Sequence, residues 1–138
     1  MSPSALGPSV AQLMTRDPVV VRADASLKEA AALLEQYRIS GLPVVDADGA
    51  LAGVLSQTDL VRARATEHLW TSWPGLAVRH LMTQPALTIA ASASLGEAAR
   101  LMEEHHVHRL VVVADDGRTP IGIISTTDLV RAMAGTAD

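Results

Sequence analysis

The sequence contains two copies of one unit, and this internal repeat constrains the fold more than any other feature. Four segments match in the same order in the two halves: VAQLMT (10–15) with VRHLMT (78–83), ASLKEAAALLE (25–35) with ASLGEAARLME (93–103), LPVVDADG (42–49) with LVVVADDG (110–117), and GVLSQTDLVRA (53–63) with GIISTTDLVRA (122–132). Self-similarity at a long, nearly fixed spacing indicates copies of one supersecondary unit that pack together. The chain therefore consists of two structural repeats.

Each copy predicts the order strand, helix, strand, strand, helix. Ser26 with Glu29, and Ser94 with Glu97, form capping-box patterns that predict the start of the first helix. Apolar residues at helical spacing give this helix a buried stripe, predicted as Leu27, Ala30, Ala31 and Leu34 in the first copy and Leu95, Ala98, Ala99 and Met102 in the second. We predict strands at 19–22 and 86–89, at 42–45 and 110–113, and in runs that end at Ser56 and Ser125, with final helices from Thr58 and Thr127.

A unit of about 55 residues buries too little surface to be stable alone, so we expect the two copies to share a core around a pseudo-twofold axis. The predicted fold class is α/β (α+β). Within the joining segment, Trp70 and Trp73 are predicted to cover this core. The expected division is a flexible N-terminus (1–9), a first repeat (10–66), a linker (67–77), a second repeat (78–134) and a tail (135–138).

Composition excludes several classes of function. The absence of cysteine excludes disulfides, thiol catalysis and thiolate zinc sites. A net charge of −4 without basic clusters argues against nucleic acid as a partner. The longest apolar run, residues 110–114, is far shorter than the roughly 20 residues that cross a bilayer, and the N-terminus lacks the pattern of a secretion signal. We therefore expect a cytoplasmic protein with no membrane partner.

The doubled unit resembles the tandem CBS domain, or Bateman module. The likeness rests on LMT at the start of each copy and on the pattern G-h-h-S-x-T-D-L at the end, where h is apolar, and it covers residues 10–132. The resemblance implies a regulatory module rather than an enzyme, with adenosine-containing ligands in clefts between its repeats and pairing into a homodimer. The chain as read shows no further domain, so we expect it to act in trans on a partner protein that the sequence does not identify.

The second copy is also similar to a nucleotide-binding repeat of the γ subunit of AMP-activated protein kinase, through VHRLVVV (107–113) and GIISTTDL (122–129). The likeness implies that His108 and Arg109 meet phosphate and that Asp128 binds the ribose hydroxyls. With few aromatic residues available, aliphatic side chains would flank the adenine. AMP or ATP is expected as a regulatory ligand, with no cofactor required and no catalytic residue. The predicted site is Thr88, Ile89, Val107, His108, Arg109, Ser125, Thr127 and Asp128.

The residue types at the end of the second copy suit this chemistry. Ser125 and Thr127 lie where the last helix begins, and the free N–H groups of a helix N-terminus attract anions. An ionised Asp128 accepts hydrogen bonds only, so its two oxygens can receive both hydroxyls of a ribose. Gly122, at the start of a strand, lets backbone or ligand approach closely. Ser-x-x-Asp is equally a plain helix cap, however, and spacing alone does not separate the two interpretations.

The histidines at positions 105, 106 and 108 raise two further possibilities. Histidine is a common metal ligand, but a further ligand at suitable spacing is missing, so we predict no metal site. No nucleophile pairs with these histidines, which argues against catalysis. His105 and His106 are predicted to be solvated residues at a helix end, where positive charge suits the helix dipole.

The first copy departs from the nucleotide pattern. Ser40 and Gly41 stand where the second copy has His108 and Arg109, and Val20 stands where it has Thr88. We therefore predict a weaker second cleft that keeps Ser56, Thr58 and Asp59 and that takes a less phosphorylated ligand or none. The alternative function is an interaction or oligomerisation module whose clefts stay empty and whose Ser-x-x-Asp motifs are only helix caps.

Overall fold

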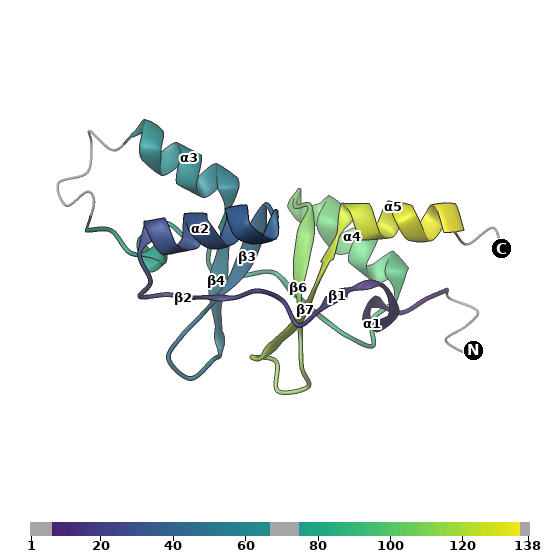
Figure 1. Cartoon of the computed structure of the whole chain (residues 1–138). Coiled ribbons are helices and arrows are strands. Elements are labelled where there is room, and N and C mark those ends of the chain that lie inside the picture. Colours follow the sequence, from purple (N-terminus) through teal and green to yellow (C-terminus); the bar gives the residue numbers. More distant parts are fainter. Residues whose placement is uncertain (1–6, 67–74, 136–138) are drawn as a thin grey trace. The chain divides into compact units, whose positions relative to one another are not determined.

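The computed structural model describes residues 7–66 and 75–135, and each repeat contains both strands and helices, as predicted (Figure 1). Trp70 and Trp73, most of the predicted linker, and parts of the predicted N-terminus and tail lie outside the described residues. Within the described residues, no helix combines the length and the apolar character that a membrane span requires.

The first half comprises α1 (Val10–Leu13), β1 (Thr15–Arg16), β2 (Val21–Arg22), α2 (Leu27–Tyr37), β3 (Gly41–Val45), β4 (Leu51–Ser56) and α3 (Gln57–Ala65). The second half comprises the 3-10 turn η3 (Val78–His80), β5 (Thr88–Ala90), α4 (Leu95–His105), β6 (Arg109–Val113), β7 (Pro120–Ser125) and α5 (Thr126–Gly135).

The chain folds into two compact units, and each unit takes its leading segment from the other copy. One unit joins the residues up to Pro18 with those from Leu87 onward, and the other runs from Val19 to Ala86. The first has a sheet in the order β1-β7-β6-β5, and the second has a sheet in the order β2-β3-β4. Thr15 pairs with Ile123 at the edge of one hairpin, while Thr83 forms the matching bridge to Val54. The LMT motif of each copy therefore packs on the hairpin of the other.

Each unit has its own apolar core between helix and sheet. In the first unit α4 and α5 pack together, α4 contacts β6 and α5 contacts β7. Ala98 and Met102 of α4 are buried, as are the matching Ala30 and Leu34 of α2, and the predicted helix caps at Ser26 and Ser94 are present. Leu27 and Leu95 are half-buried.

The predicted apolar stripe is wrong at one position in each helix. Ala31 and Ala99 are exposed. The residues that each helix buries are spaced four apart, at Ala30 and Leu34 and at Ala98 and Met102, which defines a seam narrower than the predicted stripe. An alanine is tolerated at each of these exposed positions because it favours the helix and carries little apolar surface.

Candidate functional site

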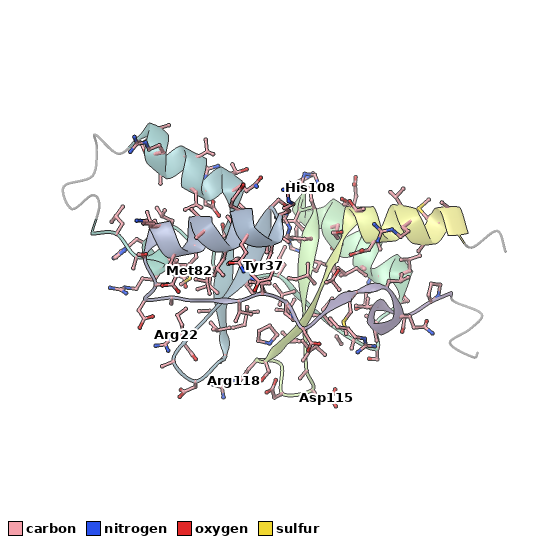
Figure 2. All side chains as sticks on the ribbon, viewed as in Figure 1. Arg22, Tyr37, Met82, His108, Asp115 and Arg118 are labelled. Carbon is pink, nitrogen blue, oxygen red and sulfur yellow. The ribbon has the colours of Figure 1, made fainter. Side chains whose placement is uncertain are left out.

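Several candidate residues of the second copy gather at one end of the β6–β7 hairpin, where α5 begins. Arg109, the first residue of β6, lies directly opposite Ser125, the last residue of β7. The backbone N–H of Thr126 donates to the carbonyl of His108 at 2.9 Å, which holds the start of α5 against the start of β6. Figure 2 marks His108 at this end and Asp115 at the opposite end of the hairpin. A short antiparallel hairpin thus brings residues far apart in sequence to one place.

Asp128 lies at the centre of this arrangement and is 8% exposed, the one buried charged residue in the described part of the chain. Its Oδ2 accepts from the backbone N–H of Ser125 at 2.8 Å and from the Ser125 hydroxyl at 3.1 Å. The Asp128 N–H donates back to the Ser125 Oγ at 3.3 Å, and Arg131 Nη1 lies 3.4 Å from Oδ1. These reciprocal bonds satisfy donors at the helix N-terminus and fix the orientation of the carboxylate.

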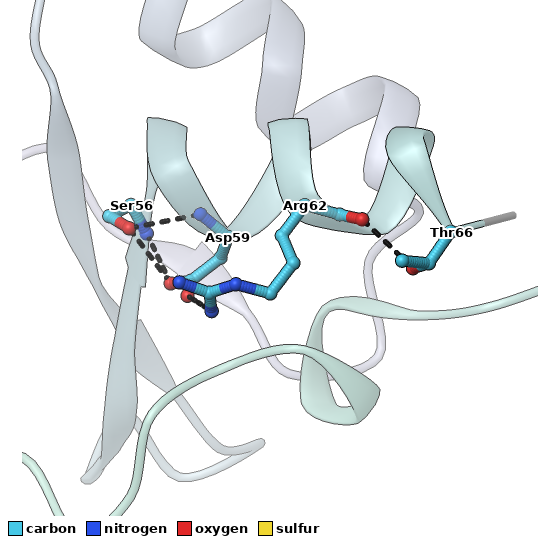
Figure 3. A network of polar contacts seen from close by, with 4 residues as sticks. All are labelled: Ser56, Asp59, Arg62 and Thr66. Carbon is cyan, nitrogen blue, oxygen red and sulfur yellow. Dashed lines mark hydrogen bonds and ion pairs between the residues drawn. The ribbon is translucent and has the colours of Figure 1, made fainter.

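The first copy repeats this network closely (Figure 3). Asp59 Oδ2 accepts from the Ser56 N–H at 2.8 Å and from its hydroxyl at 3.0 Å, and Arg62 Nη1 lies 3.6 Å from Asp59 Oδ1. At the far end of α3, the Thr66 hydroxyl donates to the Arg62 carbonyl at 2.8 Å. The cap geometry predicted by the Ser-x-x-Asp spacing is therefore present in both copies.

The two hairpin ends differ in charge rather than in backbone geometry. In the first copy the Gln57 N–H donates to the Ser40 carbonyl at 2.8 Å, and Gly41 lies opposite Ser56. In the second copy the position of Gly41 is taken by Arg109, whose side chain is half-buried. Burial lowers the pKa of the Arg109 guanidinium from its ordinary value. Arginine stays protonated in proteins, so a positive charge lies partly out of water at this end of the second copy.

The other predicted site residues differ in their exposure. Thr127 is exposed in the first turn of α5, and Thr88 is exposed on β5, paired with Val111 of β6. Ile89 is 4% exposed and packs in the core of its unit, where Val107 packs against the same cluster. Little of the Ile89 side chain therefore remains accessible to a ligand.

Arg131 contacts Asp128 but was not among the predicted site residues. Arg131 lines a shallow depression on the surface of α5 together with Thr126, Thr127 and Val130. The signal was present in the sequence, because Asp and Arg three residues apart on a helix lie on the same side, and the motif TDLVRA places such a pair in both copies.

Gly53 of β4 and Gly122 of β7 accommodate protein rather than leave space for a ligand. A methyl group at Gly122 would lie 2.5 Å from Met14 Sδ and 3.0 Å from the Thr15 carbonyl. A methyl group at Gly53 would lie 2.7 Å from the Thr83 carbonyl. The close backbone approach predicted for Gly122 is thus made by the LMT segment, which lies over the hairpin.

The histidines lie at the end of α4. His105 belongs to its last turn, and His106 ends it in the left-handed conformation with φ 54°, as Arg38 ends α2 with φ 52°. All three histidines from 105 to 108 are exposed. Over the described residues, no group of three or more His, Cys, Asp or Glu side chains is placed to hold a metal ion.

Comparison with known sequences gives one family and a set of larger relatives. The family model of the CBS domain matches residues 10–66 and 78–135. The chain is 35% identical over 121 residues to homoserine O-acetyltransferase of Methanocorpusculum labreanum, covering 88% of this chain and 23% of that enzyme. It is 36% identical over 119 residues to inosine-5′-monophosphate dehydrogenase of Mycobacterium leprae, covering 86% of this chain and 21% of the dehydrogenase. The chain thus spans about a fifth of the length of these curated relatives.

Solved structures with the same fold include proteins in complex with adenosine compounds. CBSX2 in complex with AMP is 33% identical, with a TM-score of 0.81, and the match covers 96% of this chain and all of that one. CBSX2 from Arabidopsis thaliana is 34% identical, with a TM-score of 0.80 over 95% of this chain and 97% of that one. The CBS domain pair of protein MJ0100, in complex with 5′-methylthioadenosine and S-adenosyl-L-methionine, is 26% identical, with a TM-score of 0.83 over 94% of this chain and 98% of that one. Hypoxic Response Protein I, with two coordinated zinc ions, is 26% identical, with a TM-score of 0.76 over 90% of this chain and 98% of that one.

Proposed function

This chain belongs to the CBS-domain family and carries two repeats of that domain, and from this premise we propose that it is a regulatory module that binds an adenine nucleotide (AMP, ADP or ATP) through its second repeat. The enzymes it resembles extend far beyond the matched region, which supports a regulatory rather than a catalytic role for the chain. Related pairs in complex with AMP or S-adenosyl-L-methionine support an adenosine-type ligand.

The observation that carries the proposal is the half-buried Arg109 at the end of the hairpin where α5 begins. A guanidinium partly out of water and the N-terminus of a ten-residue helix together favour a phosphate over a neutral group. Asp128 supplies a carboxylate beside them, and its Oδ1 has one contact at 3.4 Å and thus retains acceptor capacity. In this site Arg109 and His108 would meet phosphate, Ser125 and Thr127 would add hydroxyls, and Asp128 would bind ribose.

The first repeat has the same backbone and a matching, partly buried carboxylate at Asp59, but Gly41 replaces the arginine. We propose that this repeat binds a phosphorylated ligand weakly or not at all. Loss of either aspartate removes an equivalent helix cap, whereas only the loss of Asp128 affects the proposed nucleotide site.

We further propose that the ligand state is passed to a separate partner protein, with the module acting as a homodimer in the cytoplasm. The outer side of α5 carries Val130 and Met133, 63% and 69% exposed, which supports an apolar contact with a second copy. Sedimentation equilibrium tests this part. If the protein sediments as a monomer up to its solubility limit, the proposed homodimer is wrong.

A thermal-shift panel of AMP, ADP, ATP, S-adenosylmethionine and adenosine tests the ligand class. A compound held only by the folded protein raises the melting temperature, by an increment that grows with ligand concentration. We expect AMP, ADP or ATP to raise it more than adenosine does, and the difference to shrink in Arg109→Ala. No shift with any of the five compounds would refute nucleotide binding.

The second candidate is an interaction module that takes no ligand. The complete cap networks at Ser56–Asp59 and Ser125–Asp128 favour it, because they explain both aspartates without a nucleotide. The same panel separates the two functions, since the interaction module predicts no response to any adenosine compound but a dimer by sedimentation.

A further inference from the structure

The two carboxylate oxygens of Asp128 are used unequally. Oδ2 accepts from the Ser125 N–H at 2.8 Å and from its hydroxyl at 3.1 Å, so both of its acceptor positions are filled by the helix cap. Oδ1 has the Arg131 guanidinium at 3.4 Å. Any hydroxyl that reaches this carboxylate without breaking the cap must therefore bind Oδ1.

A ribose presents two neighbouring hydroxyls, and Oδ1 has two acceptor positions. Arg131 takes one of them, so a ribose that donates both hydroxyls to Oδ1 must displace the arginine. A ribose bound through both hydroxyls thus competes with Arg131 for Oδ1.

The contact of Arg131 with Asp128 is weak and is easily broken. The Arg131 side chain is 73% exposed, whereas that of Asp128 is 10% exposed, and the contact is a single one at 3.4 Å rather than a bidentate pair. Such exposed pairs are weak, and the guanidinium regains water when it moves. Arg131 also lines the shallow depression on α5 with Thr126, Thr127 and Val130, so a released guanidinium remains beside the site.

We propose that Arg131 is a positioning residue that selects for phosphorylated adenosine by exchanging its partner. In the free protein its guanidinium pairs with Asp128 Oδ1. When the ribose takes Oδ1, the guanidinium moves to the phosphate of the same ligand. AMP replaces the lost ion pair with a stronger one, because its phosphate carries more than one negative charge, whereas adenosine breaks the pair and offers nothing in return. This inference rests on the proposed nucleotide site and adds the reason why that site prefers a phosphorylated ligand.

The first copy supplies a matched control. Arg62 makes the same contact with Asp59 Oδ1 at 3.6 Å, and its side chain is 68% exposed. Arg62→Gln therefore removes an equivalent surface ion pair and an equivalent charge without touching the proposed nucleotide site. Any effect of Arg131→Gln that Arg62→Gln reproduces is a general effect of charge or of helix stability.

The test is calorimetric titration of AMP and of adenosine into the unmodified protein, Arg131→Gln, Arg131→Lys and Arg62→Gln. For Arg131→Gln we expect adenosine to bind about two- to fivefold tighter and AMP about two- to fivefold weaker, so that the AMP preference falls roughly tenfold. Arg131→Lys keeps the charge but loses the planar fork, and we expect an intermediate preference. Arg62→Gln should leave both affinities at the tight site unchanged.

Opposite changes for the two ligands are the signature of the exchange. If Arg131→Gln weakens AMP and adenosine by the same factor, Arg131 acts only by supporting the cap and the inference is wrong. It is also wrong if neither affinity changes. If the unmodified protein binds neither compound, the proposed nucleotide site itself fails, which is a different result from an unaltered preference in a protein that binds both.

Discussion

Substitution of Gly53 by alanine should destabilise the chain more than the same change at Gly122, although the two positions match in sequence. At Gly53 the new methyl group lies 2.7 Å from the Thr83 carbonyl, and that carbonyl cannot retreat freely because it accepts from the Val54 N–H at 3.0 Å. At Gly122 the closest atom is Met14 Sδ at 2.5 Å, the far end of a flexible side chain, and the Thr15 carbonyl is at 3.0 Å. The obstacle is backbone in one case and chiefly side chain in the other.

The magnitudes follow from these contacts. Overpacking costs about 1–3 kcal/mol, and a weakened backbone hydrogen bond adds about 0.5–1.5 kcal/mol. Alanine restricts the unfolded chain more than glycine does, which offsets about 0.4–1 kcal/mol of this destabilisation. We therefore expect Gly53→Ala to lower the free energy of unfolding by about 2–3 kcal/mol and Gly122→Ala by about 1–2 kcal/mol. Gly96 in α4 is the control, because a methyl group there meets nothing closer than 3.8 Å, and Gly96→Ala should stabilise the helix by about 0.5–1 kcal/mol.

Urea denaturation followed by circular dichroism measures these differences, provided that the slope of the transition stays constant among the variants. A second pair of variants separates the two obstacles. Shortening the side chain with Met14→Ala should offset much of the Gly122→Ala cost, so the double variant loses less than the sum of the two single losses. Met82→Ala should not rescue Gly53→Ala, because the Thr83 carbonyl remains. Full rescue there, or equal stability of Gly53→Ala and the unmodified chain, would refute the reasoning.

Ser56→Ala and Ser125→Ala should each lower the free energy of unfolding by about 1 kcal/mol in calorimetric melting, since each removes one N-terminal cap; an unchanged melting temperature in both would contradict the observed networks. Hydrogen bonds from the Thr119 hydroxyl and from the Arg118 and Thr119 amides lower the pKa of Asp116 from 3.8 to about 2. The stabilisation from ionised Asp116 is therefore complete above about pH 4 and is lost as the pH falls through about 2, so the stability deficit of Asp116→Asn in urea titrations should shrink over that interval and not above it. EDTA should change the melting temperature by less than about 1 °C, because metal sites that matter couple binding to folding, and a larger drop would implicate the histidines at 105–108.

The sequence predicted the order of elements well because the physical signals are local. Ser26 and Ser94 cap their helices as predicted, and the final strands end at Ser56 and Ser125. The final helices begin at Gln57 and Thr126, one residue before the predicted start, because the serine is itself the cap. The sequence did not predict α1 and β1, because these short elements carry no periodic pattern of apolar residues.

The exchange of leading segments between the units was beyond the reach of local patterns. The segment VAQLMT does not indicate which hairpin it covers. Gly53 and Gly122 each leave room for a methionine, Met82 at Gly53 and Met14 at Gly122, and the sequence does not distinguish the two pairings. Arg131 was missed for a different reason. Its spacing from Asp128 indicates a contact, but the importance of that contact depends on the filling of Oδ2 by Ser125, which only the side-chain geometry shows. Ile89 was predicted at the ligand, but strand alternation turns it into the core, while its neighbour Thr88 faces outward.

Asp128 and Asp59 make the same helix cap in the two copies, so their substitution tests directly whether the second repeat holds the nucleotide. Calorimetric titration with AMP should give binding in the unmodified protein that Asp128→Ala weakens by about tenfold or more, because charged hydrogen bonds of this kind contribute about 1.5–3 kcal/mol. Arg109→Ala should weaken it to a similar extent. Asp59→Ala should leave the tight site nearly intact while costing the same cap. If Asp59→Ala abolishes tight AMP binding and Asp128→Ala does not, the nucleotide binds to the first repeat, which contradicts the proposed site.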